Sequence, residues 1–100
     1  MAIIYHIAMP EDWKKAKAKG SYEAPSLETE GFIHCSEQQQ VKGVLDRYFK
    51  NKSGLLLLVL DTEKLRSPLK YELAPSIQEE FPHIYGSINM DAVVEVKEIA

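Results

Sequence analysis

The chain has 100 residues, of which 45% are hydrophobic and 27% are charged, and its formal net charge is −3 at neutral pH. This composition predicts one globular, soluble domain over residues 1–100 with a single core, and it excludes a disordered chain. The basic residues form no extended stripe, so we do not expect a nucleic acid as the partner. The longest apolar run, residues 54–60, is far shorter than the roughly 20 residues of a membrane-spanning helix.

The N-terminal residues lack the basic segment that opens a secretory signal, so we expect no such signal. A single cysteine, Cys35, leaves no internal disulfide to form. Both features favour the reducing cytoplasm as the location of the protein, without a membrane partner.

Predicted strands and helices alternate in the first third of the chain. Residues 3–8 alternate in the manner of a strand that is buried on at least one face. Residues 10–20 predict a short helix, because Pro10 suits its first turn, acidic residues follow at its start and lysines lie near its end. Residues 21–30 are expected to form a loop, and residues 31–35 to form the second strand.

A second helix is predicted after this strand. Ser36 has the character of a helix N-cap, with Gln39 as its capping-box partner. The apolar residues between Val41 and Phe49 recur at the spacing of a helix packed on a core. The continuously apolar residues 55–61 then predict a central strand that is covered on both faces.

The C-terminal part is expected to contain two further strands. Residues 71–73 predict a short strand, and residues 91–99 predict the last one. Between them, residues 74–89 contain two prolines and a glycine, and we expect an irregular segment there. The resulting order, β-α-β-α-β-β-β, favours an α+β domain with two main helices over a doubly wound α/β sheet.

Three histidines are the main candidates for chemistry. His6 and His34 lie in otherwise apolar strands, where a backbone partner in the core is one interpretation. If these strands are neighbours, however, both rings face one cleft and need a polar environment. His83 lies in a long irregular segment of the kind that is often functional. A zinc site built from all three is an alternative, although the chain has no closely spaced histidine pair.

Other residues have competing structural and functional interpretations. Cys35 should face away from His34 on the same strand, so we expect it in the core. Glu72 is either a solvent-exposed strand residue or an acid or base. Trp13 is expected to pack the first helix onto the sheet. The polar and aromatic candidates for contacting a ligand are Tyr22, Ser36, Tyr85 and Asn89.

The order of these motifs resembles the small bacterial family known as domain of unknown function 952. The segments that carry the resemblance cover nearly the whole chain and are, in order, IYHIA, SLETEGFIHCS, LLLLVLD, KYE and FPHIYGSINMDAVV. The resemblance implies a fold similar to that of the ADP-ribosyltransferases. That fold is a split, mixed β-sheet around a cleft, and in those enzymes the cleft holds NAD.

The same resemblance implies roles for individual residues. His6, in the segment YHI, looks like the histidine that binds the ribose of NAD, and His34 and Ser36 occupy the place beside the nicotinamide. No glutamate of this chain matches the catalytic glutamate of many members. The two arginines, Arg47 and Arg66, do not match the basic motif of the related NAD-dependent RNA 2′-phosphotransferases.

We therefore expect a nucleotide-binding protein whose ligand is NAD or an ADP-ribose-like molecule, and whose activity would be NAD-dependent glycosyl or ADP-ribosyl transfer. The expected catalytic residues are His6, His34 and His83, and the expected nucleotide contacts are Tyr22, Ser36, Tyr85 and Asn89. Two alternatives stay open. One is a binding module that has kept the cleft without the chemistry, and the other is a metal-assisted hydrolase that uses the three histidines.

Overall fold

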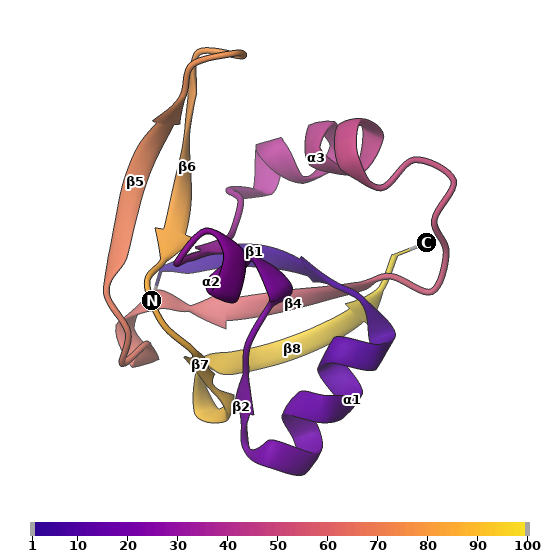
Figure 1. Cartoon of the computed structure of the whole chain (residues 1–100), viewed down its shortest axis with the longest axis vertical. Helices are drawn as coiled ribbons and strands as arrows, with labels where there is room; N and C mark the ends of the chain where they lie inside the picture. Colours follow the sequence, from indigo (N-terminus) through magenta and orange to yellow (C-terminus); the bar gives the residue numbers. More distant parts are fainter. Residues whose placement is uncertain (1, 100) are drawn as a thin grey trace.

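The computed structural model describes residues 2–99 (Figure 1). Within these residues the strands form three small sheets, which in spatial order contain β1 (Ile3–Ala8), β4 (Leu56–Asp61) and β8 (Val93–Glu98); β2 (Ser21–Tyr22) and β7 (Ile88–Asn89); and β3 (Ile33–His34), β6 (Glu79–Ile84) and β5 (Leu69–Ala74). The helices are α1 (Pro10–Lys19), α2 (Pro25–Thr29) and α3 (Val41–Tyr48), with short 3-10 turns η1 (Gln38–Gln40), η2 (Thr62–Lys64) and η3 (Met90–Ala92).

The strand β4 is the centre of the first sheet, as its apolar sequence predicts. It pairs with β1 along one edge and with β8 along the other, so its backbone groups are satisfied on both sides. Leu58 and Leu60 are fully buried in the main core. Leu55 and Leu57 belong to a second apolar cluster, which the apolar stripe of α3 covers. The prediction of a central strand covered on both faces is confirmed.

The first helix also forms as its sequence predicts. Pro10 occupies its first turn, Glu11 and Asp12 lie near the positive end of the helix dipole, and lysines lie in the last turn. The helix ends at Lys19, and Gly20 adopts the left-handed conformation, with φ of 94°, that commonly follows a helix. Trp13 packs against the main core, as expected.

Two predictions around the second helix are wrong. The expected loop at residues 21–30 contains β2 and α2, because Tyr22 pairs with the distant Ile88 and a proline starts a short helical turn. The helix cap also lies one residue later than expected. Glu37 is the N-cap and Gln40 is its capping-box partner. Ser36 is instead held by backbone pairing with Tyr5.

The prediction of an irregular segment at residues 74–89 is wrong as well. The predicted short strand extends to Leu69–Ala74 and turns back as β6, so that these two strands form a hairpin. Pro82 does not interrupt β6: it is buried, and its carbonyl oxygen accepts a hydrogen bond from the backbone N–H of Cys35. Sequence breakers therefore marked a strand whose pairing is long-range, and only the turn at residues 75–78 matches them.

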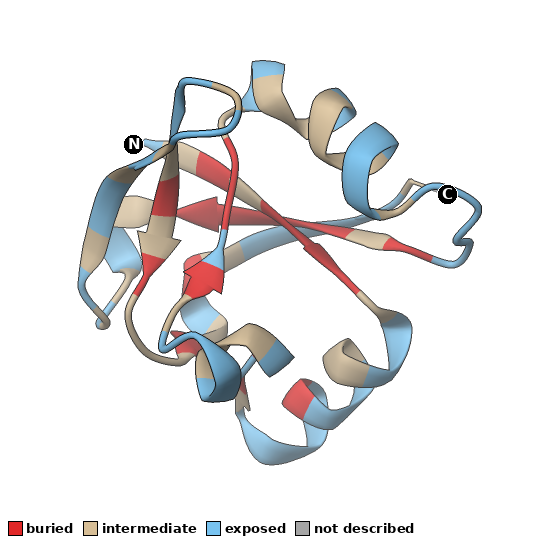
Figure 2. Ribbon diagram, turned by 45° about the horizontal axis from the view of Figure 1, so that its top comes forward, coloured by how far each residue is buried: buried red, intermediate tan, exposed pale blue. Residues whose placement is uncertain are grey.

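A split between the first and third sheets positions the candidate site. Tyr5 and Ser36 exchange two backbone hydrogen bonds of 2.8 and 2.7 Å, and this single bridge joins the two sheets. Figure 2 shows buried residues gathered on the strands around this junction, while most of β5 and β8 is exposed.

These features confirm the α+β class and correct one part of it. Every strand pair that the structure describes is antiparallel, so the expectation of a mixed sheet is wrong. Local connections such as the β5–β6 hairpin favour this arrangement, since antiparallel neighbours need no crossover helix. Between residues 2 and 99, the helices are too short or too polar to span a membrane.

Candidate functional site

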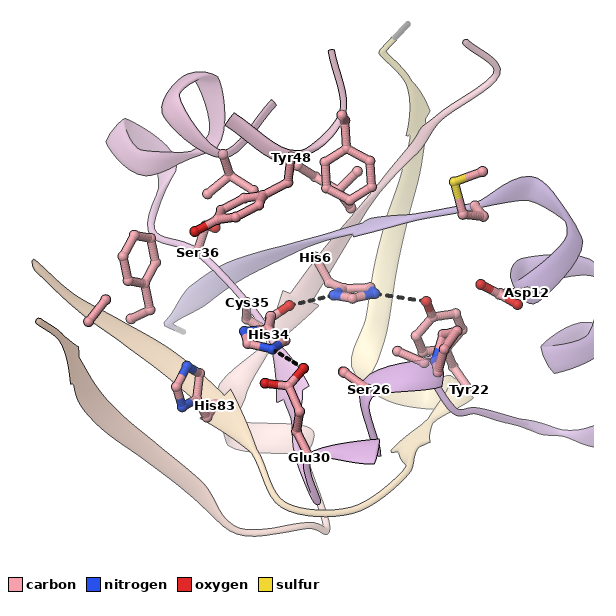
Figure 3. Close-up of a pocket in the computed structure, with 18 residues that line it drawn as sticks. His6, Asp12, Tyr22, Ser26, Glu30, His34, Cys35, Ser36, Tyr48 and His83 are labelled. Atoms are coloured by element: carbon pink, nitrogen blue, oxygen red, sulfur yellow. Dashed lines mark hydrogen bonds and ion pairs between the residues drawn. The ribbon is translucent and has the colours of Figure 1, made fainter. Parts of the chain in front are cut away.

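A cavity of about 630 Å³ lies at the split between the sheets (Figure 3). This volume is in the range of small-molecule sites. Its walls come from many parts of the chain, which the sheets and helices bring together. The lining residues are His6, Ile7, Met9, Asp12, Tyr22, Ala24, Pro25, Ser26, Glu30, His34, Cys35, Ser36, Val44, Tyr48, Phe49, Ala74, Phe81 and His83.

His6 projects from β1 and bridges two other elements with its ring nitrogens (Figure 3). Its Nδ1 lies 2.6 Å from the carbonyl oxygen of His34, and its Nε2 lies 2.7 Å from the hydroxyl of Tyr22. Because a carbonyl oxygen only accepts hydrogen bonds, Nδ1 carries the proton and Nε2 accepts from Tyr22. Burial lowers the pKa of His6 to about 4, so the imidazole is neutral at physiological pH.

Tyr22 supplies a buried hydroxyl to the same site. Its side chain is fully enclosed, with 1% of the residue exposed, and its ring meets that of His6 edge-on at 5.1 Å between centroids. Burial raises the pKa of Tyr22, which keeps the hydroxyl protonated and donating to His6. Its oxygen retains a lone pair that can accept a hydrogen bond from a ligand in the cavity.

Ser36 places a second hydroxyl on the cavity wall. The residue is only 6% exposed, and its backbone is fixed by the bridge to Tyr5. Across residues 2–99 its side chain has no hydrogen-bond partner, yet no fully buried side-chain polar atom in that range lacks one. The Ser36 hydroxyl is therefore reached from the cavity and is free to bind a ligand.

Two histidines lie side by side at the edge of the cavity. His34 and His83 are paired across β3 and β6, and their ring centroids are 5.3 Å apart. His34 is half-exposed, and its Nε2 lies 3.1 Å from Oε2 of Glu30. His83 stacks on Phe32 at 4.1 Å, so one aromatic ring contacts both histidines.

The charged groups of the cavity are acidic. Asp12 and Glu30 line it, whereas no lysine or arginine among the described residues does. The interior therefore favours neutral or positively charged parts of a ligand over phosphate groups. In residues 2–99, no group of three or more His, Cys, Asp or Glu side chains is arranged to hold a metal ion. The three histidines line one cavity without forming a metal-ligand set.

Comparisons with known proteins identify the family. The family model described as a protein of unknown function, DUF952, matches residues 7–96. The chain belongs to the DUF952 family. The resemblance of the sequence motifs to this family is thereby confirmed.

Solved structures agree with this assignment. The chain is similar to the crystal structure of protein CC0527 from Caulobacter crescentus, with 29% identity, a TM-score of 0.89, and coverage of 99% of this chain and 87% of that one. It is also similar to the solution NMR structure of CC0527, with 30% identity, a TM-score of 0.82, and coverage of 99% and 85%. The comparison with curated proteins found no match.

The structure of this DUF952 protein brings together most of the residues proposed from the sequence. His6, His34, His83, Tyr22 and Ser36 all line the cavity. Tyr85 and Asn89 do not. The hydroxyl of Tyr85 donates to Glu72, behind His83. Asn89 bonds to the backbone of Lys64 and Arg66 and ties a surface turn to β7.

Acidic partners of the histidines are the residues that sequence reasoning missed. Glu30 was hidden because α2 was not predicted, although its position four residues before His34 is a usable signal. Glu72 was left between a solvent-exposed and a chemical interpretation, and it lies 2.7 Å from Nδ1 of His83. Cys35, in contrast, is buried as expected, and burial raises the pKa of its thiol.

Proposed function

We propose that this DUF952 protein binds a ribosyl nucleotide, NAD or an ADP-ribose-like molecule, in the histidine-lined cavity. The observation that carries the proposal is the neutral His6, which is buried at the split and holds the hydroxyl of Tyr22 at the cavity surface. The free hydroxyl of Ser36 lies on the same wall. The resemblance of the motif order to the ADP-ribosyltransferase-like proteins supports a nucleotide over other small molecules.

The two hydroxyls suit the ribose of such a ligand. The oxygen of Tyr22 accepts from a ribose hydroxyl while its proton stays on His6, and Ser36 both donates and accepts. In this arrangement His6 acts through Tyr22, since both of its nitrogens are already engaged. Tyr48 and Phe49 from the end of α3 lie on the opposite wall and offer aromatic surface for the base.

The acidic lining indicates which half of the nucleotide lies inside. The nicotinamide ring of NAD is positively charged, and Asp12 and Glu30 favour a cation. The phosphates, for which the cavity has no lysine or arginine among the described residues, are placed toward solvent. A carboxylate near the ribose also stabilises the positive charge that develops at C1′ as nicotinamide leaves.

The experiment is a titration of the ¹⁵N-labelled protein with NAD and with ADP-ribose, followed by amide chemical shifts. We expect shifts at residues 5–7 and 32–36, and tighter binding of NAD because only NAD carries the cationic ring. Ser36→Ala should weaken binding about 3- to 10-fold, the value of one hydrogen bond. The matched control is Ser53→Ala, in an exposed loop, which should leave the affinity unchanged. Absence of shifts at millimolar ligand would reject the proposal.

A second candidate is a binding module without turnover. The observation that favours it is the double engagement of His6, which leaves this histidine unable to transfer a proton without losing a hydrogen bond. NAD-dependent shifts without any release of nicotinamide would support the module. Release of nicotinamide at a rate above that of the buffer would reject it.

A further inference from the structure

We infer that Glu72 and His83 form an acid–base dyad at the edge of the cavity, with His83 as the catalytic base and Glu72 as its positioning residue. The dyad would activate water for attack on the ribosyl C1′ of the bound nucleotide. The identity of the substrate rests on the proposed function, whereas the geometry of the dyad does not.

The hydrogen bonds of Glu72 define the protonation of His83. Oε1 of Glu72 lies 2.7 Å from Nδ1 of His83 and also accepts from the hydroxyl of Tyr85. These two hydrogen bonds, that of Tyr85 first, lower the pKa of Glu72, so the carboxylate stays ionised near neutral pH. An ionised carboxylate only accepts, so Nδ1 of the neutral imidazole carries the proton and Nε2 presents its lone pair.

The ring of His83 is held in place as a positioned base should be. Its side chain is 14% exposed, and Phe32 stacks on it with 4.1 Å between centroids and 18° between planes. The ring lines the cavity, and within residues 2–99 its Nε2 has no hydrogen-bond partner. A base whose orientation is fixed by a third group is the arrangement that activates nucleophiles in many enzymes.

The other two histidines fit this role less well. His6 has both nitrogens engaged, and burial holds its pKa at about 4, so it is a poor base. His34 is half-exposed and is held by Glu30, which is itself half-exposed on the surface. Of the three, His83 combines a restrained ring, a partly buried position and a free nitrogen.

The chemical step balances with water as the only co-reactant. Nε2 of His83 removes a proton from water as the oxygen forms a bond to C1′ of the ribosyl group. The bond from C1′ to the nicotinamide nitrogen breaks, and its electron pair neutralises the pyridinium. The imidazolium then gives its proton to solvent. The products are nicotinamide, ADP-ribose and one proton, and no oxidant or reductant is consumed.

The experiment measures nicotinamide release from NAD by the full chain and its variants. We expect His83→Ala to lower kcat about 10²- to 10⁴-fold while the NAD-induced amide shifts persist. Added imidazole should restore part of the rate in His83→Ala, a rescue that a structural role would not show. His34→Ala, on the same face, is the control and should not respond to imidazole. Glu72→Gln should lower kcat, and Glu72→Asp should retain part of it.

A second measurement keeps the dyad separate from its substrate. Long-range ¹H–¹⁵N spectra of the free protein should show His83 with its proton on Nδ1, and Glu72→Gln should shift the tautomer toward Nε2–H. NAD shifts with no release, or release unaffected by His83→Ala, would overturn the dyad. Absence of NAD shifts would overturn the proposed function instead. In that case the tautomer on the free protein still decides the dyad, and a dominant Nε2–H form overturns it.

Discussion

Three residues of one type have three different environments in this protein. His6 is buried and doubly hydrogen-bonded, His34 is half-exposed beside a carboxylate, and His83 is stacked on Phe32 and bonded to Glu72. A histidine takes its chemistry from such surroundings more than from its ordinary pKa. The pattern of the sequence placed these residues on one cleft, but only the surroundings separate a structural histidine from a candidate base.

The burial of His6 predicts a pH dependence of stability. Its pKa is about 4 in the folded protein and 6.5 without burial, so the unfolded chain binds the proton first as pH falls. The free energy of unfolding should therefore fall as pH is lowered from 6.5 toward 4, with an upper limit of about 3 kcal/mol. Urea unfolding of the wild type and of His6→Gln at a series of pH values measures this contribution.

The window between about pH 5 and 6.5 is the diagnostic one, because carboxylates with ordinary or lowered pKa values stay ionised there. His6→Gln should flatten the dependence in this window, whereas His34→Gln, at a half-exposed site, should leave most of it. Equal slopes for the wild type and His6→Gln would show that His6 is not protected from protonation by the fold.

At the scale of elements, the start of α3 is tied to the third sheet by one side chain. Oε1 of Gln40 accepts from the backbone N–H of Glu37 at 2.9 Å, and its Nε2 donates to the carbonyl oxygen of Glu80 in β6 at 2.8 Å. The capping box therefore both ends the helix and anchors the β5–β6 hairpin.

We expect Gln40→Ala to lower the free energy of unfolding by about 1 kcal/mol, since it removes a cap and a link between elements. Denaturant unfolding measures the change. The matched control is Gln39→Ala, one residue earlier, which the sequence pattern favoured as the capping residue and which is exposed. A larger loss for Gln39→Ala than for Gln40→Ala would contradict the assigned cap.

The elements that the sequence predicted well are those whose signals are local. Residues 3–8, 10–19 and 56–61 have a clear period or a continuous apolar run, and their burial follows directly from it. The hairpin of β5 and β6 lacks such a signal, because Pro82 reads as a breaker until β3 is known to pair with it. The carboxylate partners of the site depend on the same long-range pairing, so composition and spacing do not reveal them.

At the scale of the molecule, the sheets differ in how far they are covered. β4 lies between two strands in the core, while the outer half of the β5–β6 hairpin extends away from the other sheets (Figure 1). Local opening should follow this difference, because a segment with few buried contacts separates from the core at low free energy.

Hydrogen exchange of the native protein tests this expectation. Amides of Leu57–Leu60 should exchange only on global unfolding, whereas those around the turn at residues 75–78 should exchange faster by several orders of magnitude. Both sets are measured in one sample, which controls for pH and temperature. Equal protection of the two regions would mean that the hairpin opens only with the whole fold.

The buried position of Cys35 has a practical consequence for such measurements. Its thiol is enclosed in the core and its pKa is raised, so the reactive thiolate is scarce while the protein is folded. A thiol reagent therefore modifies the chain mainly when the core opens. The single cysteine of the sequence thus serves as an internal clock for opening, and it reads that event without any engineered label.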